Sequence, residues 1–288
     1  KKMKQINYFF QFLFIIILFS IFKILGYKLS SALGGKIFEI IGPLFRSKEL
    51  IHSNIKRAIP NIESKRLNKI TKSMWNNYGR VLAEYMFIKD FSEGKLENHI
   101  NIEGQAILEK IKKLNKPVVF ISGHLANFEL MAMHIEKSGI KLSAIYRPLN
   151  NIFLNKIMER IRKKYICKFQ IKKGIGGIRK IVNMQKDNFS TALMIDQRVS
   201  EGIEVNFFNH KALTTTIPAQ LIKKYNIEVV PIFIERIEKI NFKITISEPL
   251  KFSNDNTIEN ITENLNLVLE KMILKKPEQW IWSHNRWK

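Results

Sequence analysis

Residues 117–129 read PVVFISGHLANFE, and this stretch predicts the core of the fold. Pro117 to Ser122 is a short, β-branched apolar run that is typical of a buried strand. Gly123 ends the run, and Leu125 to Lys137 then has the pattern of a helix. His124 is therefore expected in the turn at the carboxyl end of a strand, which is where open α/β sheets bind their ligands.

His124 and Glu129 form the candidate catalytic pair. Glu129 follows His124 by five residues, so a turn at His124 can bring the Glu129 carboxylate to one imidazole nitrogen. That contact would fix the tautomer and raise the basicity of the other nitrogen, as a general base near neutral pH requires. The plain alternative is a capping or surface pair, because a histidine and a glutamate at this spacing also occur by chance.

Beyond residue 101 the chain alternates between strand-like and helix-like segments. Strands are expected at 118–122, 142–146, 167–171, 191–195, 229–234 and 242–247. Helices are expected at 125–137, 152–164, 175–185, 218–225 and 258–273. Short buried strands that alternate with helices predict an α/β fold with a single, mainly parallel sheet covered by helices. Residues 48–96 have helical spacing, and Glu84 among their apolar residues is a candidate buried carboxylate.

Polar residues follow two further strands of this predicted sheet. Arg147 comes after the second strand, and Asp196 and Gln197 come after the fourth. Because the carboxyl ends of parallel strands meet in one crevice, we expect these residues near His124. The alternatives are a simple turn at Arg147 and a helix N-cap at Asp196.

Composition narrows the possible partners. The 288 residues carry a net charge of +23, which favours anionic partners such as a phospholipid surface, an acidic protein or a phosphorylated substrate. No nucleic-acid-binding motif is present, so nucleic acid is not an expected partner. The single Cys167 excludes an intramolecular disulfide, and the six histidines form no HExxH pair, so neither a metal nor another cofactor is expected.

The amino-terminal region predicts a membrane anchor. Tyr8 to Leu25 is almost entirely apolar, with Lys23 as its one charge, and as a helix it spans about 27 Å, close to the hydrocarbon thickness of a bilayer. We therefore expect an anchor over residues 1–27 and one α/β domain over residues 28–288, on the cytoplasmic face. Two alternatives stay open: a cleaved signal peptide, and a helix embedded from one side of the membrane.

Several motifs together resemble a known family. They are HLANFE at 124–129, YRPLNN at 146–151, Arg162, IDQR at 195–198, FFNHKALTTT at 207–216, VVPIFIER at 229–236 and PEQWIWSHNRWK at 277–288. The first fits the H-x4-D/E signature of the glycerolipid acyltransferase superfamily, and the whole set resembles the bacterial lipid A secondary acyltransferases. The resemblance covers essentially the whole chain.

The resemblance implies transfer of a fatty acyl chain from acyl carrier protein to a hydroxyl of a Kdo-bearing lipid A precursor, at the bacterial inner membrane. It assigns His124 as general base and Glu129 as the residue that holds it. An arginine held by a carboxylate suits an acceptor phosphate or an oxyanion, and we expect Asp196 to hold Arg162 in this way. The residues expected to bind substrate or stabilise the oxyanion are Arg147, Arg162, Asp196 and Gln197.

Two other functions remain open on the sequence. One is a related membrane acyltransferase with a different acceptor, such as a lysophospholipid or a mannosylated phosphoinositide. The other is a membrane-tethered basic module without enzymatic activity. Product analysis separates the two acyltransferases, and turnover of an acyl thioester separates an enzyme from a binding module.

Overall fold

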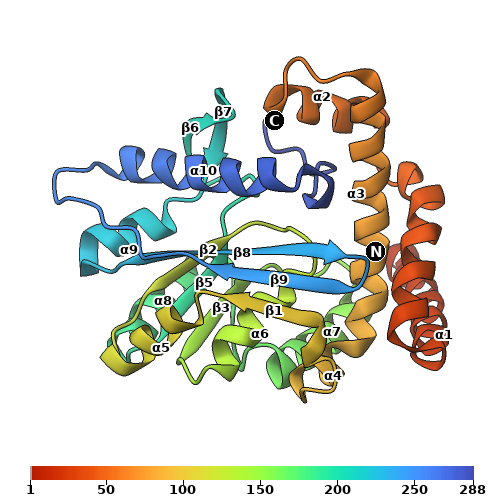
Figure 1. Ribbon diagram of the computed structural model, residues 1–288, viewed down its shortest axis with the longest axis horizontal. Coiled ribbons are helices and arrows are strands. Elements are labelled where there is room, and N and C mark those ends of the chain that lie inside the picture. Colours follow the sequence, from red (N-terminus) through yellow and green to blue (C-terminus); the bar gives the residue numbers. More distant parts are fainter. Residues whose placement is uncertain (1) are drawn as a thin grey trace.

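The computed structural model describes residues 2–288, so Lys1 of the predicted anchor lies outside it. Within residues 2–288, seven strands form one sheet in the order β1-β9-β8-β2-β5-β3-β4 (Figure 1). All neighbouring strands of this sheet are parallel except β8 and β9, which confirms the predicted mainly parallel sheet. The strands are β1 Ile100–Glu103, β2 Val119–Ser122, β3 Leu142–Tyr146, β4 Phe169–Lys172, β5 Ser190–Met194, β8 Val229–Glu238 and β9 Asn241–Ile246, with β6 Ile203–Phe207 and β7 His210–Thr214 in a separate hairpin.

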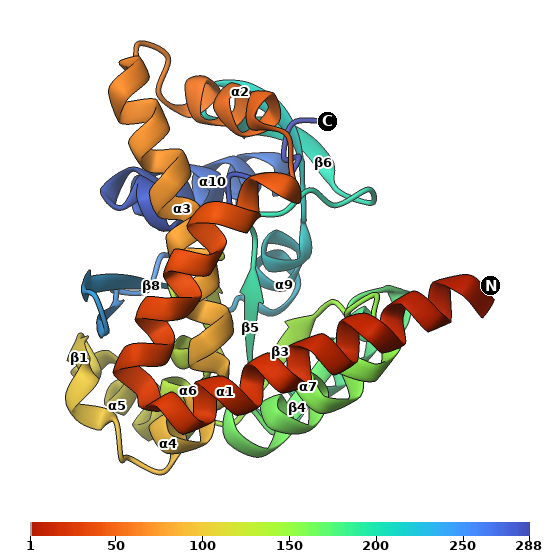
Figure 2. The ribbon, with the colours of Figure 1, turned by 90° about the vertical axis from the view of Figure 1, so that its right-hand side faces the viewer.

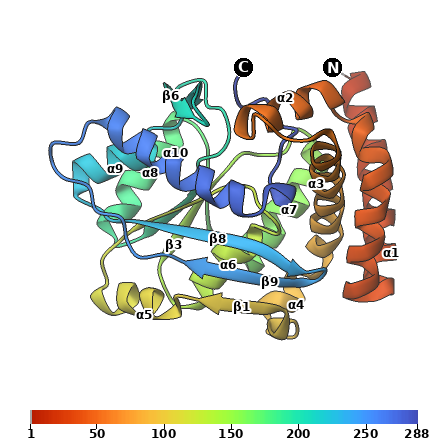
Figure 3. The same ribbon diagram turned by 45° about the horizontal axis from the view of Figure 1, so that its top comes forward.

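Helices cover both faces of the sheet. Figure 3 shows α9 and α10 on one side of it and α5 and α6 on the other. The helices are α1 Lys2–Ile41, α2 Lys48–Ala58, α3 Ser64–Glu84, α4 Ile88–Ser92, α5 Gln105–Leu114, α6 Glu129–Lys137, α7 Ile152–Tyr165, α8 Ile175–Lys186, α9 Ile217–Tyr225 and α10 Ile258–Lys275. Short 3-10 turns lie at Gly42–Leu44, Tyr85–Phe87, Glu97–His99 and Pro277–Gln279. The sheet is thus the middle layer of three.

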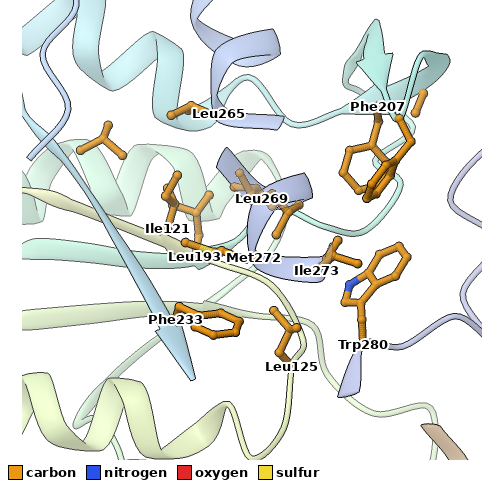
Figure 4. Packing of buried hydrophobic residues seen from close by; sticks show 14 of the residues in the cluster. Ile121, Leu125, Leu193, Phe207, Phe233, Leu265, Leu269, Met272, Ile273 and Trp280 are labelled. Atoms are coloured by element: carbon orange, nitrogen blue, oxygen red, sulfur yellow. The ribbon is translucent and has the colours of Figure 1, made fainter. Parts of the chain in front are cut away.

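The central strand β2 shows why both faces need cover. Alternate residues of a strand point to opposite faces. Val119 and Ile121 belong to the apolar cluster on the α10 side, whereas Phe120 belongs to the cluster on the α6 side. Figure 4 shows Ile121 and Leu193 beside Leu269 of α10. A strand that is apolar throughout is stable only when helices bury it from both sides.

The amino-terminal helix α1 is bent at Gly26. This residue has φ 76° and ψ 166°, which is not helical and favours glycine. The bend divides α1 into a first arm, residues 2–25, and a second arm, residues 27–41. Figure 2 shows both arms across the same face of the molecule, the first along α7 and the second along α3. The helix is long and apolar enough to cross a membrane, in agreement with the predicted membrane association.

The second arm packs closely on α3 through two glycines. A Cβ atom on Gly79 would lie 2.0 Å from the carbonyl oxygen of Gly34, and one on Gly34 would lie 2.5 Å from the carbonyl oxygen of Gly79. No side chain fits at either position without moving a backbone. The two helices therefore form a tight layer beside the sheet.

Candidate active site

His124 and Asp196 follow neighbouring strands at the same level of the sheet. Strands β2 and β5 are parallel, and Ser122 lies opposite Met194. His124 and Asp196 each come two residues beyond this pair, so the strand register places them side by side. Asp196 is fully buried, whereas His124 is partly exposed.

Asp196 accepts hydrogen bonds that orient His124. Its Oδ1 atom lies 2.8 Å from Nδ1 of the imidazole. Its Oδ2 atom accepts from the backbone N–H of His124 at 2.7 Å and from the indole N–H of Trp280 at 2.8 Å. Trp280 is itself buried, and Figure 4 shows its ring between Leu125 and Phe207. The carboxylate is therefore held in place and directed at the imidazole.

The electrostatics of this pair fix the tautomer of His124. Burial would raise the pKa of Asp196, but His124 and the hydrogen bonds lower it to about 2, so the carboxylate is ionised and can only accept. Nδ1 of the imidazole must then carry the proton, which leaves the lone pair on Nε2. Burial lowers the pKa of His124, but Asp196 outweighs burial and raises it above the ordinary value. Among residues 2–288, none hydrogen-bonds to Nε2.

Glu129 holds Arg162 of α7. The Nε and Nη2 atoms of the guanidinium both donate to Oε1 of Glu129, at 2.8 and 2.5 Å. Both side chains are largely buried, so the ion pair is only weakly screened by solvent. Arg162 is therefore a fixed cation near His124. The charges of Glu129 and Arg162 both influence the pKa of His124.

The structure exchanges the partners that the sequence predicted. The expected hydrogen bond from Glu129 to His124 is wrong, and so is the expected pairing of Asp196 with Arg162. The reason is that α6 begins at Glu129 and not at Leu125, and a turn precedes it. The turn directs the Glu129 carboxylate toward α7, and the neighbouring strand supplies Asp196 to the imidazole instead. The catalytic roles of these residues remain predictions.

The turn between His124 and α6 is held by distant parts of the chain. Ala126 has φ +43°, a left-handed conformation that is unfavourable for alanine. Its backbone N–H donates to the carbonyl oxygen of Gln279 at 3.2 Å. Asn127 donates through Nδ2 to Oε2 of Glu84 at 3.2 Å. These contacts stabilise a backbone conformation that the local sequence alone disfavours.

Glu84 connects this turn to three other elements. It is fully buried at the end of α3, as predicted, and both its oxygens accept from the guanidinium of Arg236 on β8, at 2.5 and 3.0 Å. Ser31 of α1 also donates to Glu84, at 2.7 Å. The turn that carries His124 is thus part of one buried polar network with α1, α3 and β8.

A cavity of about 630 Å³ opens in front of His124. Five of the six predicted site residues line it, and Asp196 lies behind His124 and does not. The lining predicted residues are His124, Glu129, Arg147, Arg162 and Gln197. The deeper wall is apolar and includes Phe120, Met131, Ile135, Ala144, Ala192 and Ile232. Within residues 2–288, no three or more His, Cys, Asp or Glu side chains are grouped to hold a metal ion.

Trp280, Gln279 and His284 belong to the motif at residues 277–288, but no role was predicted for them from the sequence. A buried indole N–H needs a hydrogen-bond acceptor, and this requirement was the only indication in the sequence that Trp280 donates to a group such as the Asp196 carboxylate. His284 lines the cavity and accepts from the backbone N–H of Arg198 at 3.0 Å. Burial lowers the pKa of His284 to about 4, so it is neutral.

A base of fixed tautomer, a fixed cation and an apolar cavity suit proton removal from a hydroxyl and attack on an acyl carbonyl. Comparison with known proteins agrees with this chemistry. The chain is 22% identical over 270 residues to a lipid A biosynthesis palmitoleoyltransferase of Escherichia coli K12, covering 92% of this chain and 86% of that protein. It is 20% identical over 253 residues to the lipid A biosynthesis myristoyltransferase of the same organism, covering 86% and 76%.

A lipid A biosynthesis acyltransferase 2 of Shigella flexneri is 24% identical over 196 residues, which cover 65% of this chain and 60% of that protein. These identities are low, but each match extends over more than half of both proteins. The model of the family described as bacterial lipid A biosynthesis acyltransferase matches residues 1–288. The chain therefore belongs to the bacterial lipid A biosynthesis acyltransferase family.

Proposed function

We propose that this acyltransferase moves a fatty acyl chain from an acyl carrier protein thioester to a hydroxyl of a Kdo-bearing lipid A precursor. The observation that carries the proposal is the geometry of His124. Its Nδ1 is bound to the Asp196 carboxylate at 2.8 Å, and the residue lines a cavity with an apolar depth. The family membership supports the acceptor class, since the relatives are named for lipid A biosynthesis.

In the proposed reaction, Nε2 of His124 removes the proton of the acceptor hydroxyl. The oxygen then attacks the thioester carbonyl carbon, and the carbon–sulfur bond breaks as the tetrahedral intermediate collapses. The imidazolium returns its proton to the departing sulfur. Asp196 does not touch substrate; it stabilises the imidazolium and keeps Nδ1 protonated, which replaces the His124–Glu129 pair in the mechanism.

Arg162 is placed for the negative charge in this reaction. Glu129 fixes the guanidinium by two hydrogen bonds, so the cation needs no reorganisation when charge develops on the carbonyl oxygen or when an acceptor phosphate binds. Arg147 and Gln197 line the same cavity and are the further candidates for contacts with the polar part of the acceptor. The apolar depth of the cavity fits the acyl chain of the donor.

The test uses the purified full-length protein in detergent, with acyl carrier protein thioesters of several chain lengths and a Kdo-bearing lipid A precursor. Mass spectrometry should detect the precursor with one added acyl chain. The same protein is given a coenzyme A thioester, a lysophospholipid and a mannosylated phosphoinositide as alternative donor and acceptors. Exclusive acylation of one of these other acceptors would replace the proposed substrate, and no thioester turnover with any of them would contradict an acyl-transfer function.

A further inference from the structure

The first arm of α1 has two apolar faces with different surroundings. One stripe, at intervals of three and four residues, faces the protein and consists of Tyr8, Phe12, Ile15, Phe19 and Phe22. The opposite stripe of the described arm is exposed and carries only apolar side chains: Met3, Ile6, Phe10, Leu13, Phe14, Ile17, Ile21 and Ile24. A helix with 3.6 residues per turn separates these two stripes onto opposite sides.

The inner stripe is attached to the protein along its length. The rings of Phe12 and Phe153 on α7 are 5.8 Å apart. The side-chain amide of Asn151 donates to the carbonyl oxygen of Tyr8 at 2.8 Å. At the other end of the arm, Lys23 forms an ion pair with Asp90. The arm therefore lies against the domain and does not extend away from it.

The second arm continues the exposed apolar surface past the bend. Its outward side chains are Leu29, Leu33 and Ile40, and Leu44 and Phe45 extend the surface beyond it. Figure 2 shows the two arms on one face of the molecule. A contiguous apolar face of this extent marks a membrane or protein interaction site. Exposed Lys28 lies on the same arm and suits anionic head groups, whereas Lys36 forms an ion pair with Glu39 at 3.2 Å.

The cavity of the candidate active site reaches α1, since Phe38 of the second arm lines it. Its wall includes Tyr78 of α3, which lies under the second arm, and Leu149, which precedes the α7 helix under the first arm. Tyr78 and Leu149 are each 40% exposed, so they mark where the cavity reaches the surface. Exposed Arg147, Asn150 and Lys173 also line the cavity, so its mouth is bordered by apolar side chains and by cations that suit anionic head groups.

We propose that both arms of α1 lie flat in one leaflet of an anionic phospholipid bilayer, and that the cavity opens into this leaflet between them. The helix α1 is long enough to cross a bilayer, but length alone does not determine its orientation. The contacts of the inner stripe with the domain determine it. The identity of the lipids that enter the cavity rests on the proposed function. The orientation of α1 does not.

The test measures the depth of three positions on the outer stripe of the first arm. Phe10→Cys, Ile17→Cys and Ile24→Cys are each spin-labelled in the full-length protein, in vesicles of phosphatidylethanolamine and phosphatidylglycerol. The native Cys167 is 1% exposed and is expected to stay unlabelled. Collision rates with oxygen and with a water-soluble nickel complex report the depth of each label. We expect equal depths at all three positions.

A crossing helix gives a different profile. Ile17 would then lie deeper or shallower than each neighbour by about 10 Å, because seven residues separate the positions. That profile would overturn the proposal, and so would labels that are all as accessible to water as the reference Lys116→Cys on the exposed surface of the domain. Ile40→Cys on the second arm is expected at the depth of the first arm. These results are independent of acyl transfer, so failure of the proposed function leaves them unchanged.

Discussion

The basicity of His124 depends on a carboxylate that is itself fully buried. Asp196 has no access to water and is satisfied only by His124 and Trp280 among the side chains described. Removing its charge leaves burial as the main influence on the imidazole, and burial favours the neutral form. The pH profile of the reaction is therefore the direct readout of this pair.

Asp196→Asn is expected to move the acidic limb of the pH–rate profile to lower pH and to reduce the rate by about 10² to 10⁴. A general base must be unprotonated, so activity rises as pH increases through the pKa of His124, which is raised in the wild type. Without the Asp196 carboxylate the pKa of His124 is lower, so the acidic limb of the profile moves to lower pH. The measurement is kcat/KM between about pH 5 and 9, with the exposed Asp187→Asn as control. An unshifted limb would contradict the role of Asp196.

Arg162 is expected to need both its charge and its shape. Arg162→Lys keeps the charge but loses the two hydrogen bonds to Glu129, so kcat should fall by about 10-fold or more. The kcat of Glu129→Gln should fall similarly, because a neutral amide holds the guanidinium less firmly. The exposed Arg160→Lys on the same helix is the control. Full activity of Arg162→Lys would make Arg162 one of many interchangeable surface cations.

At the level of whole elements, the buried network around Glu84 joins four segments that are distant in sequence. Its bidentate contact with Arg236 is shielded from water. Loss of one member of such a pair leaves an uncompensated buried charge. The network therefore links the stability of the domain to the conformation of the turn that carries His124.

Glu84→Ala is expected to lower the free energy of unfolding by about 3 to 5 kcal/mol, since it leaves Arg236 buried and unpaired. The double variant with Arg236→Met should recover part of this loss because it removes the second charge. Thermal unfolding in detergent measures both, and the exposed Glu109→Ala on α5 should unfold like the wild type. Equal stability of Glu84→Ala and the control would show that the network does not stabilise the fold.

The elements themselves were largely predictable, but their contacts were not. The runs around β2 and β3 have strong apolar patterns, and the strand ends correctly indicated that His124 and Asp196 are neighbours, although Asp196 lies behind His124 and does not line the cavity. Their direct pairing depends on the register of β2 with β5, which are not consecutive strands. The turn before α6 is held at Ala126 by the carbonyl oxygen of Gln279, about 150 residues away, so no local pattern predicts it. For the same reason the sequence-based prediction paired His124 with Glu129 and Arg162 with Asp196, whereas the structure pairs His124 with Asp196 and Arg162 with Glu129.

For the molecule as a whole, the topology of the sheet places the exposed apolar face of α1 and the candidate active site at the same end. The carboxyl ends of β2, β5 and β3 carry the polar residues of the cavity, and α1 and α3 lie at the same end of the sheet (Figure 1). The net charge of +23 favours anionic partners, which include the phospholipid surface and the carrier protein of the proposed function. A sequence pattern predicts the long apolar helix, but the bend at Gly26, after which the helix continues across the domain, is a tertiary feature.

The proposed role of His124 as general base is tested most directly by removing its imidazole. Turnover of an acyl carrier protein thioester with the lipid A precursor is measured for His124→Ala and for His210→Ala, whose side chain is exposed on the β6–β7 hairpin. We expect His124→Ala to lose about 10² to 10⁴ in rate while it folds and binds membranes normally, and His210→Ala to keep full activity. Wild-type turnover by a folded His124→Ala protein would contradict the account.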